Sequence, residues 1–152
     1  MGIVIGLTGA AGSGKDTVAD MLARSPGVQS TSFVPFAGAL KSICVLFLGL
    51  SENDVHTQEG KMKYNQLWGM TNREILQKVG TDAMRNGFHP DVWMNIAFLQ
   101  IAQDLGKYDL VLVPDVRFDN EAELIKDTFA GEIWQINRNH EAICDDTHPS
   151  EQ

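Results

Sequence analysis

The sequence is poor in basic residues, in cysteine and in long apolar runs, and each shortage excludes a class of protein. Lysine and arginine total 12 against 20 acidic residues, a net charge of −8 that argues against binding polymeric nucleic acid through its phosphates. Cys44 and Cys144 lie far apart without a C-x-x-C pattern, so neither a disulfide framework nor a zinc ribbon is indicated. No apolar run reaches membrane length, and residues 1–5 lack the basic start of a signal peptide. We therefore expect a cytoplasmic, single-domain protein that binds a small anion.

What the sequence does contain is a glycine-rich segment at residues 9–17, Gly-Ala-Ala-Gly-Ser-Gly-Lys-Asp-Thr. The apolar run at 3–7 predicts a strand before it, and apolar residues at 18, 21 and 22 predict a helix after it. In that setting the glycines let backbone N–H groups face one anion, while the helix dipole and Lys15 add positive charge. The alternative is a turn that only joins a strand to a helix; the lysine in register and both flanks favour a nucleoside polyphosphate site. Its candidate residues are Gly9, Ala11, Gly12, Ser13, Gly14, Lys15, Asp16 and Thr17.

Candidates for a magnesium site are Asp16, Thr17 and Asp115. Asp16 stands where such loops usually have Ser or Thr, whose hydroxyl ligates Mg²⁺. Either the helix dipole alone favours Asp16 there, or Asp16 contacts the metal, or Thr17 supplies the hydroxyl. Asp115 follows the hydrophobic run 109–113 and could hold Mg²⁺ or only cap the next turn.

Strand and helix patterns alternate along the chain. Further strands are predicted at 30–34, 109–113 and 133–136. Helices are predicted at 36–48, at 71–86, where the Thr71 to Glu74 capping box starts the helix, and at 89–105. The segment 115–121 leads into a further short helix that ends at about residue 128. Residues 51–70 show no clear period. The pattern predicts an α/β fold, a doubly wound parallel sheet that is covered on both faces and binds ligands at the carboxyl ends of its strands.

Four arginines, Arg73, Arg85, Arg117 and Arg138, are separate in sequence but could converge on one cleft as phosphate ligands. Arg117 is the strongest candidate, because it lies in a strand-end loop beside Asp115. No Ser-His-Asp order or paired histidines supply a catalytic base. A monophosphate acceptor needs none, since its second pKa is about 6 and its attacking oxygen is already ionised at neutral pH. This favours a nucleoside monophosphate over a hydroxyl acceptor.

With these residues in place, the sequence resembles the deoxynucleoside monophosphate kinases best known from bacteriophages, within the P-loop nucleotide kinases. The resemblance covers nearly the whole chain, and its most specific part is the block at residues 115–121. The matching segments are residues 9–17; Phe36-Ala37 with Leu40-Lys41; Thr71-x-Arg73-Glu74-x-Leu76-Gln77; Gly80-Thr81 with Arg85; Trp93; Asp115-Val116-Arg117-Phe118-x-Asn120-Glu121; and His148-x-Ser150-Glu151.

The resemblance implies transfer of the ATP γ-phosphate to a deoxynucleoside monophosphate with Mg²⁺. It implies one P-loop kinase domain over residues 1–152, with a helical acceptor-binding insertion at about 51–106. Lys15 and Arg117 are the expected catalytic residues, and Arg138 is expected near the donor nucleotide or a lid. The residues expected on the acceptor side are Lys41, Arg73, Gln77, Arg85, Trp93, Asp115 and Glu121.

Several alternatives remain open at this point. A dephospho-coenzyme A kinase would share the architecture but needs a hydroxyl acceptor, and a nucleotide-binding remnant would bind ATP without turnover. Such kinases usually continue beyond the His-x-Ser-Glu motif with another strand and helix. A chain that stops at Gln152 is therefore either truncated or a short member whose sheet edge a second subunit covers as a homodimer. Finally, His140, Cys144 and His148 are spaced four apart, a weak pattern for zinc because no helical periodicity accompanies it.

Overall fold

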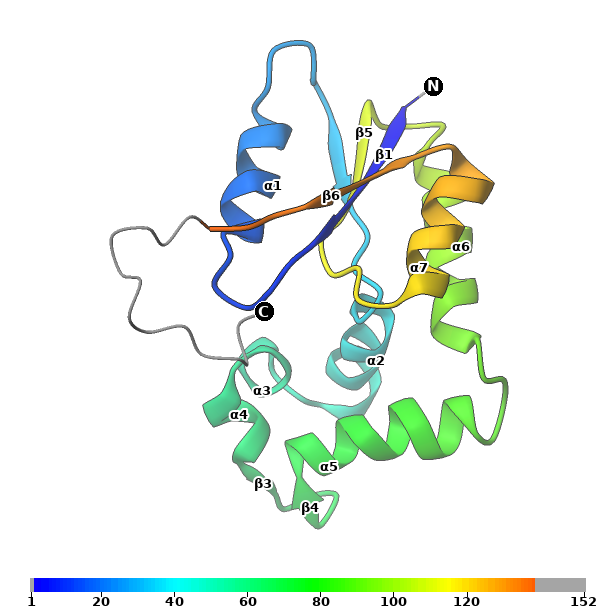
Figure 1. The fold of residues 1–152 in the computed structure, drawn as a ribbon. Coiled ribbons are helices and arrows are strands. Elements are labelled where there is room, and N and C mark those ends of the chain that lie inside the picture. Colours follow the sequence, from blue (N-terminus) through cyan, green and yellow to red (C-terminus); the bar gives the residue numbers. More distant parts are fainter. Residues whose placement is uncertain (1, 139–152) are drawn as a thin grey trace. The chain divides into compact units, whose positions relative to one another are not determined.

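The computed structural model describes residues 2–138, and the chain divides into two compact units. The first unit comprises Met1–Phe36 and Phe98–Gln152, and the second comprises Ala37–Ala97. A four-stranded parallel sheet forms the centre of the first unit, whereas the second is mainly helical (Figure 1). No helix within the described residues is long and apolar enough to cross a membrane.

The parallel sheet consists of β1 (Ile3–Thr8), β2 (Thr31–Phe33), β5 (Leu110–Val113) and β6 (Glu132–Gln135), in the order β2-β5-β1-β6. The predicted strands and their parallel arrangement are confirmed. All four residues of β5 are buried, as expected of an apolar strand between two neighbours in a parallel sheet. Because Gly6 pairs with Val113, the carboxyl ends of β1 and β5 meet at the same edge of the sheet.

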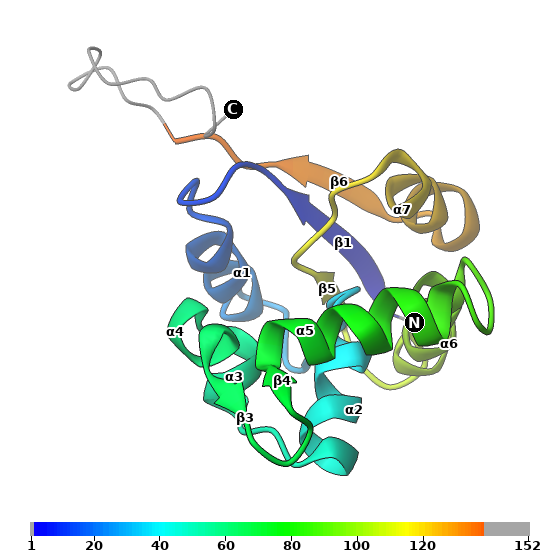
Figure 2. The same cartoon turned by 90° about the horizontal axis from the view of Figure 1, so that it is seen from below.

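Helical segments cover both faces of this sheet. On one face Ile5, Leu7 and Leu112 form a core cluster with Ala19 of α1 (Lys15–Ala23). On the other face Gly6 leaves room for Ile125 of η2 (Leu124–Thr128), a π-helical segment that continues α7 (Asp119–Glu123). Figure 2 shows α1 and α7 on opposite sides of β1. The predicted doubly wound architecture is therefore confirmed.

The second unit begins with α2 (Gly38–Leu48), which ends at Gly49 in the left-handed conformation, with φ 79°. It continues with α3 (Glu52–His56), α4 (Gln58–Met62), the hairpin of β3 (Tyr64–Asn65) and β4 (Met70–Thr71), α5 (Asn72–Gln77) and η1 (Lys78–Arg85). The last helix, α6 (Val92–Asp104), starts in this unit and ends in the first. The core of the second unit gathers around Cys44, Leu50, Val55 and Ile75.

Residues 51–70 hold more regular structure than their sequence indicates. Ser51 starts α3 through a capping box with Asp54, and the Thr57 hydroxyl caps α4 by accepting the Gly60 N–H. Both helices have five residues, too few to display a helical hydrophobic period. The capping box of Thr71 and Glu74 is confirmed, but the helix after it changes from α to π geometry at Lys78.

Candidate active site

The glycine-rich segment forms a loop between the end of β1 and the start of α1. Gly9, Gly12 and Gly14 have φ values of 151°, 76° and 98°, which L side chains rarely adopt. The Ser13 N–H donates to the Ala10 carbonyl at 3.1 Å, which closes the turn. A Cβ built at Gly12 or Gly14 would meet no described atom within 4 Å, so the space beside these two residues is open.

The first turn of α1 keeps its backbone donors available. Gly14 is its N-cap, and no side chain within residues 2–138 caps this helix, whereas Ser51, Thr57 and Thr71 cap α3, α4 and α5. An N-terminus without a capping side chain presents N–H groups and the positive end of the dipole to an anion. Lys15 is the first residue of α1 and is half-buried. The Ser13 hydroxyl oxygen is buried without a hydrogen-bond partner in the described part of the chain.

Gly9 is required by a close approach of two backbones. The Ile136 N–H donates to the Thr8 carbonyl at 2.8 Å, which extends the β1–β6 pairing to the base of the loop. A Cβ at Gly9 would lie 2.5 Å from the Ile136 carbonyl oxygen, well inside van der Waals contact. The chain after β6 therefore fixes the position from which the loop starts.

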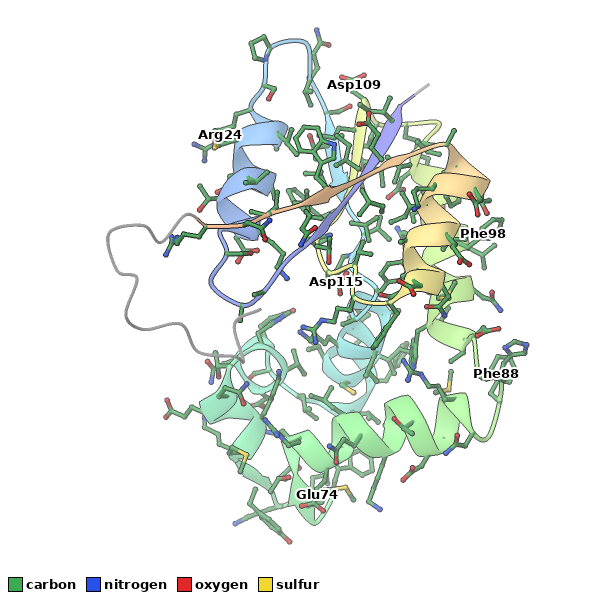
Figure 3. The ribbon with its side chains drawn as sticks, viewed as in Figure 1. Arg24, Glu74, Phe88, Phe98, Asp109 and Asp115 are labelled. Carbon is green, nitrogen blue, oxygen red and sulfur yellow. The ribbon has the colours of Figure 1, made fainter. Side chains whose placement is uncertain are left out.

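Asp115 lies at the same edge of the sheet as the loop, at the carboxyl end of β5, with Asp109 at the opposite end (Figure 3). Its Oδ1 accepts the Phe36 N–H at 2.8 Å, which joins the segments that follow β2 and β5. The Val116 N–H donates to the Leu7 carbonyl at 3.1 Å and holds the same segment against β1. The three strand ends are thus tied together around Asp115.

Arg117 and Glu121 belong to one turn in front of α7. The backbone N–H groups of Arg117 and Phe118 donate to Glu121 Oε1 at 2.8 and 3.1 Å. Glu121 therefore orders this turn, and Arg117 itself is exposed to solvent. Arg138, three residues beyond the end of β6, is also exposed.

The oxygen donors near the loop fit a loosely held magnesium ion. Asp16 and Thr17 are exposed in the first turn of α1, and Asp115 adds a second carboxylate at the same edge of the sheet. No group of three or more His, Cys, Asp or Glu side chains gathers into a metal site in residues 2–138. Mg²⁺ commonly uses one or two carboxylates and completes its shell with water and substrate phosphates, so these donors suit it.

The acceptor-side candidates Lys41, Arg73, Gln77, Arg85 and Trp93 all lie in the second unit. Lys41 is half-buried in the first turn of α2, and Arg73 and Gln77 lie four apart on α5 and share its exposed face.

Two of these acceptor-side candidates make side-chain contacts that sequence patterns did not indicate. Arg73 donates through Nη2 to Gln58 Oε1 at 2.7 Å. Trp93 is buried, and its indole N–H donates to the Gly80 carbonyl at 3.0 Å. Gln58 sits in no motif, so only the structure identifies it as a partner of Arg73. The zinc pattern at 140–148 and the His-x-Ser-Glu motif lie outside the described residues.

A glycine loop between a strand and a helix, with a lysine at the helix start and an aspartate at the next strand end, defines a P-loop nucleotide-binding α/β protein. A family model described as deoxynucleotide monophosphate kinase matches residues 50–152. A protein of Acanthamoeba polyphaga mimivirus, provisionally named deoxynucleotide monophosphate kinase, is 38% identical over 160 residues, which cover 98% of this chain and 80% of that protein. The deoxynucleoside-5'-monophosphate kinase of Escherichia phage T5 is 41% identical over 56 residues, 37% of this chain and 22% of that protein. The chain belongs to the deoxynucleotide monophosphate kinase family.

Proposed function

We propose that this protein transfers the γ-phosphate of ATP to a deoxynucleoside monophosphate and so makes the diphosphate. The observation that carries the proposal is the glycine loop, whose helix has no capping side chain among the described residues and begins with the half-buried Lys15. A loop of this kind suits a polyphosphate, and membership of the family supplies the reaction class.

On the donor side, charge neutralisation and alignment account for the chemistry. Lys15 pairs with the β- and γ-phosphate oxygens, and the N–H groups of the loop bind the oxygens between them. Asp115 and either Asp16 or Thr17 would hold Mg²⁺ together with water, and the ion would supply positive charge that offsets the charge on the phosphates. Arg117 binds the transferring phosphoryl group through its guanidinium, and Arg138 contacts the donor nucleotide.

On the acceptor side, the second unit supplies the cations for a monophosphate. Lys41, Arg73 and Arg85 pair with its phosphate, and Gln77 hydrogen-bonds its nucleoside. The contact from Gln58 restrains the Arg73 guanidinium, which reduces the entropy lost when the arginine binds phosphate. A phosphate nucleophile is ionised at neutral pH, so no general base is required.

The experiment that tests this function supplies ATP and Mg²⁺ with each of the four deoxynucleoside monophosphates, or with dephospho-coenzyme A, and follows ADP release. Release that depends on at least one deoxynucleoside monophosphate, and not on dephospho-coenzyme A, is expected. Release with dephospho-coenzyme A alone would assign a hydroxyl acceptor. ATP binding without release under any condition would assign a nucleotide-binding protein without turnover.

A homodimer, which the sequence leaves open as one of two alternatives, stays a prediction. In the described part of the sheet, β2 and β6 each pair with one neighbour only, so they are its two outermost strands, and each leaves one side of its backbone unpaired. Sedimentation equilibrium of the full chain distinguishes a monomer of 16.8 kDa from a particle of twice that mass.

A further inference from the structure

The segment that carries Arg85 is wound as a π-helix. η1 covers eight residues, Lys78–Arg85, and continues α5. The Asn86 N–H donates to the Thr81 carbonyl, five residues earlier, at 2.9 Å, and the His89 N–H donates to the Met84 carbonyl at 2.9 Å. Such winding is rare, because the α-helical hydrogen-bond pattern is ordinarily preferred, and it is frequently found at functional sites. Contacts from elsewhere must therefore hold η1 in this form.

Two neighbours restrain η1 at Gly80. Trp93, the second residue of α6, is 7% exposed, and its indole N–H donates to the Gly80 carbonyl at 3.0 Å. A Cβ added at Gly80 would lie only 2.8 Å from Leu40 Cδ2, so Leu40 occupies the space beside this glycine. Leu40 packs in turn against the buried cluster around Cys44. Gly80 is thus fixed between an indole and a core leucine, inside one compact unit.

We propose that Trp93 is a positioning residue that acts through Arg85: its hydrogen bond to Gly80 holds the π winding of η1, which sets the direction of the Arg85 side chain. A turn of α-helix holds about one residue fewer than a turn of π-helix. If η1 returned to α-helical winding, the residues beyond the change would therefore rotate about the helix axis by about 100°. The Arg85 guanidinium, at the last position of η1, would then leave the acceptor phosphate. The proposal rests on the proposed function, in which Arg85 binds that phosphate.

A direct contact between Trp93 and the acceptor is the competing explanation of its place in the family pattern. Burial argues against it, because the Trp93 side chain is almost wholly enclosed and its indole N–H already donates to the Gly80 carbonyl. The hydrogen bond instead links residues 13 positions apart, from the start of α6 to the third residue of η1. Trp93 therefore influences the acceptor site through the backbone of η1.

The chain offers a matched control in Trp68. Its indole N–H donates to the Leu48 carbonyl at 2.8 Å, so Trp68→Phe and Trp93→Phe each remove one bond from an indole to a backbone carbonyl. Trp68 is 43% exposed in the loop between β3 and β4 and does not touch η1 through that bond. Any general effect of losing an indole N–H is present in both variants.

The test measures steady-state KM for the acceptor and for ATP in both variants and in wild type. Trp93→Phe is expected to raise the acceptor KM about three- to tenfold, the range that one net hydrogen bond supports, and to leave the KM for ATP unchanged. Trp68→Phe is expected to change neither. In an Arg85→Ala background, Trp93→Phe should have almost no further effect on the acceptor KM, because the side chain that it positions is gone.

A second measurement follows amide hydrogen exchange of residues 81–86, which needs no catalysis. Faster exchange is expected in Trp93→Phe and unchanged exchange in Trp68→Phe. In Gly80→Ala the added methyl group would crowd Leu40 and disturb η1 at the same residue, so this variant should raise the acceptor KM as well. It replaces Trp93→Phe in the test if Trp93→Phe fails to fold. If wild type phosphorylates no deoxynucleoside monophosphate, the proposed function fails, while the exchange data still decide whether Trp93 holds η1.

Three results would overturn the proposal. One is an acceptor KM that stays at the wild-type value in folded Trp93→Phe or Gly80→Ala. Another is an effect of Trp93→Phe that adds in full to that of Arg85→Ala. The third is exchange of residues 81–86 that is equal in Trp93→Phe and Trp68→Phe.

Discussion

The Phe36 backbone N–H donates to Oδ1 of Asp115 at 2.8 Å, and this bond ties the chain after β2 to the chain after β5. The bond is partly buried, so it contributes to the shape of the sheet edge at which the glycine loop lies. Asp115 therefore has a structural role whether or not it also holds Mg²⁺. Substitutions at this residue separate the two roles.

Asp115→Asn keeps an oxygen that can accept the Phe36 N–H, whereas Asp115→Ala removes it. We expect Asp115→Ala to lower the free energy of unfolding by about 2 kcal/mol and Asp115→Asn by less than about 1 kcal/mol, as measured by urea unfolding. Both should lose activity, and Asp115→Asn should need more Mg²⁺ for half-maximal rate, because its charge is gone. Wild-type activity and Mg²⁺ dependence in Asp115→Asn would limit Asp115 to the structural role.

Gly9→Ala should damage the loop far more than a comparable change at another glycine with positive φ. Its Cβ would lie 2.5 Å from the Ile136 carbonyl oxygen, at a φ of 151°. Gly27 has a φ of 89°, but a Cβ there would meet no described atom within 4 Å, so Gly27→Ala is the control. We expect the free energy of unfolding, measured with urea, to fall by about 3 kcal/mol or more in Gly9→Ala and by about 1–2 kcal/mol in Gly27→Ala. Equal losses would show that the approach of Ile136 does not constrain the loop.

Arg117→Ala should lower kcat by about 100-fold, because the guanidinium stabilises charge on the transferring phosphoryl group. Its fold should be retained, since the backbone N–H of Arg117, not its side chain, binds Glu121. Arg24→Ala is the control: Arg24 is an exposed arginine at the far end of α1 from the loop (Figure 3). An unchanged kcat in Arg117→Ala would make Arg117 an ordinary surface residue.

Sequence patterns predicted the parts of this fold in which local and tertiary preferences agree. The run of apolar residues in β1 and β5 marks strands buried on both faces, and Gly49 marks the end of α2 because it adopts φ 79°. The same agreement located the glycine loop and the capping box of Thr71 and Glu74. These features carry the candidate donor site.

Other features depend on contacts that no local pattern encodes. The first helix among residues 51–70 is the exception: its capping box has Asp54 where Glu or Gln is typical, and the spacing of Ser51 and Asp54 is a local signal that could have located it. The π winding of η1 depends on Gly80 meeting Trp93 and Leu40, which lie 13 and 40 residues away. Likewise, the hydrogen bond of Asp115 to Phe36 spans 79 residues.

The thiol of Cys44 should be inert in the native protein. Cys44 is fully buried among apolar residues, and this burial raises the pKa of the thiol above its ordinary value of 9.0. In a Cys144→Ser background, a thiol reagent at pH 8 should react with Cys44 only after unfolding. Rapid reaction under native conditions would contradict the packing around Cys44.

The raised pKa of Cys44 also has a consequence for stability. Because the unfolded thiol ionises at lower pH than the folded one, ionisation favours unfolding. The stability that the folded protein gains from keeping this thiol neutral is therefore fully present below pH 9.0, and it is lost as the pH rises above that value. Urea unfolding of the wild-type protein should therefore show a steeper alkaline decline than that of Cys44→Ala, and parallel profiles would contradict the shift.

The fate of the ATP γ-phosphate tests the central claim most directly. The full chain is incubated with ATP labelled at the γ-phosphate, Mg²⁺ and each deoxynucleoside monophosphate, and the products are separated by chromatography. We predict that the label appears in a deoxynucleoside diphosphate, that Lys15→Ala abolishes most of this transfer, and that Lys126→Ala, which changes an exposed lysine of η2, does not. Label that appears only in inorganic phosphate, or transfer that persists at the wild-type rate in Lys15→Ala, would contradict the account.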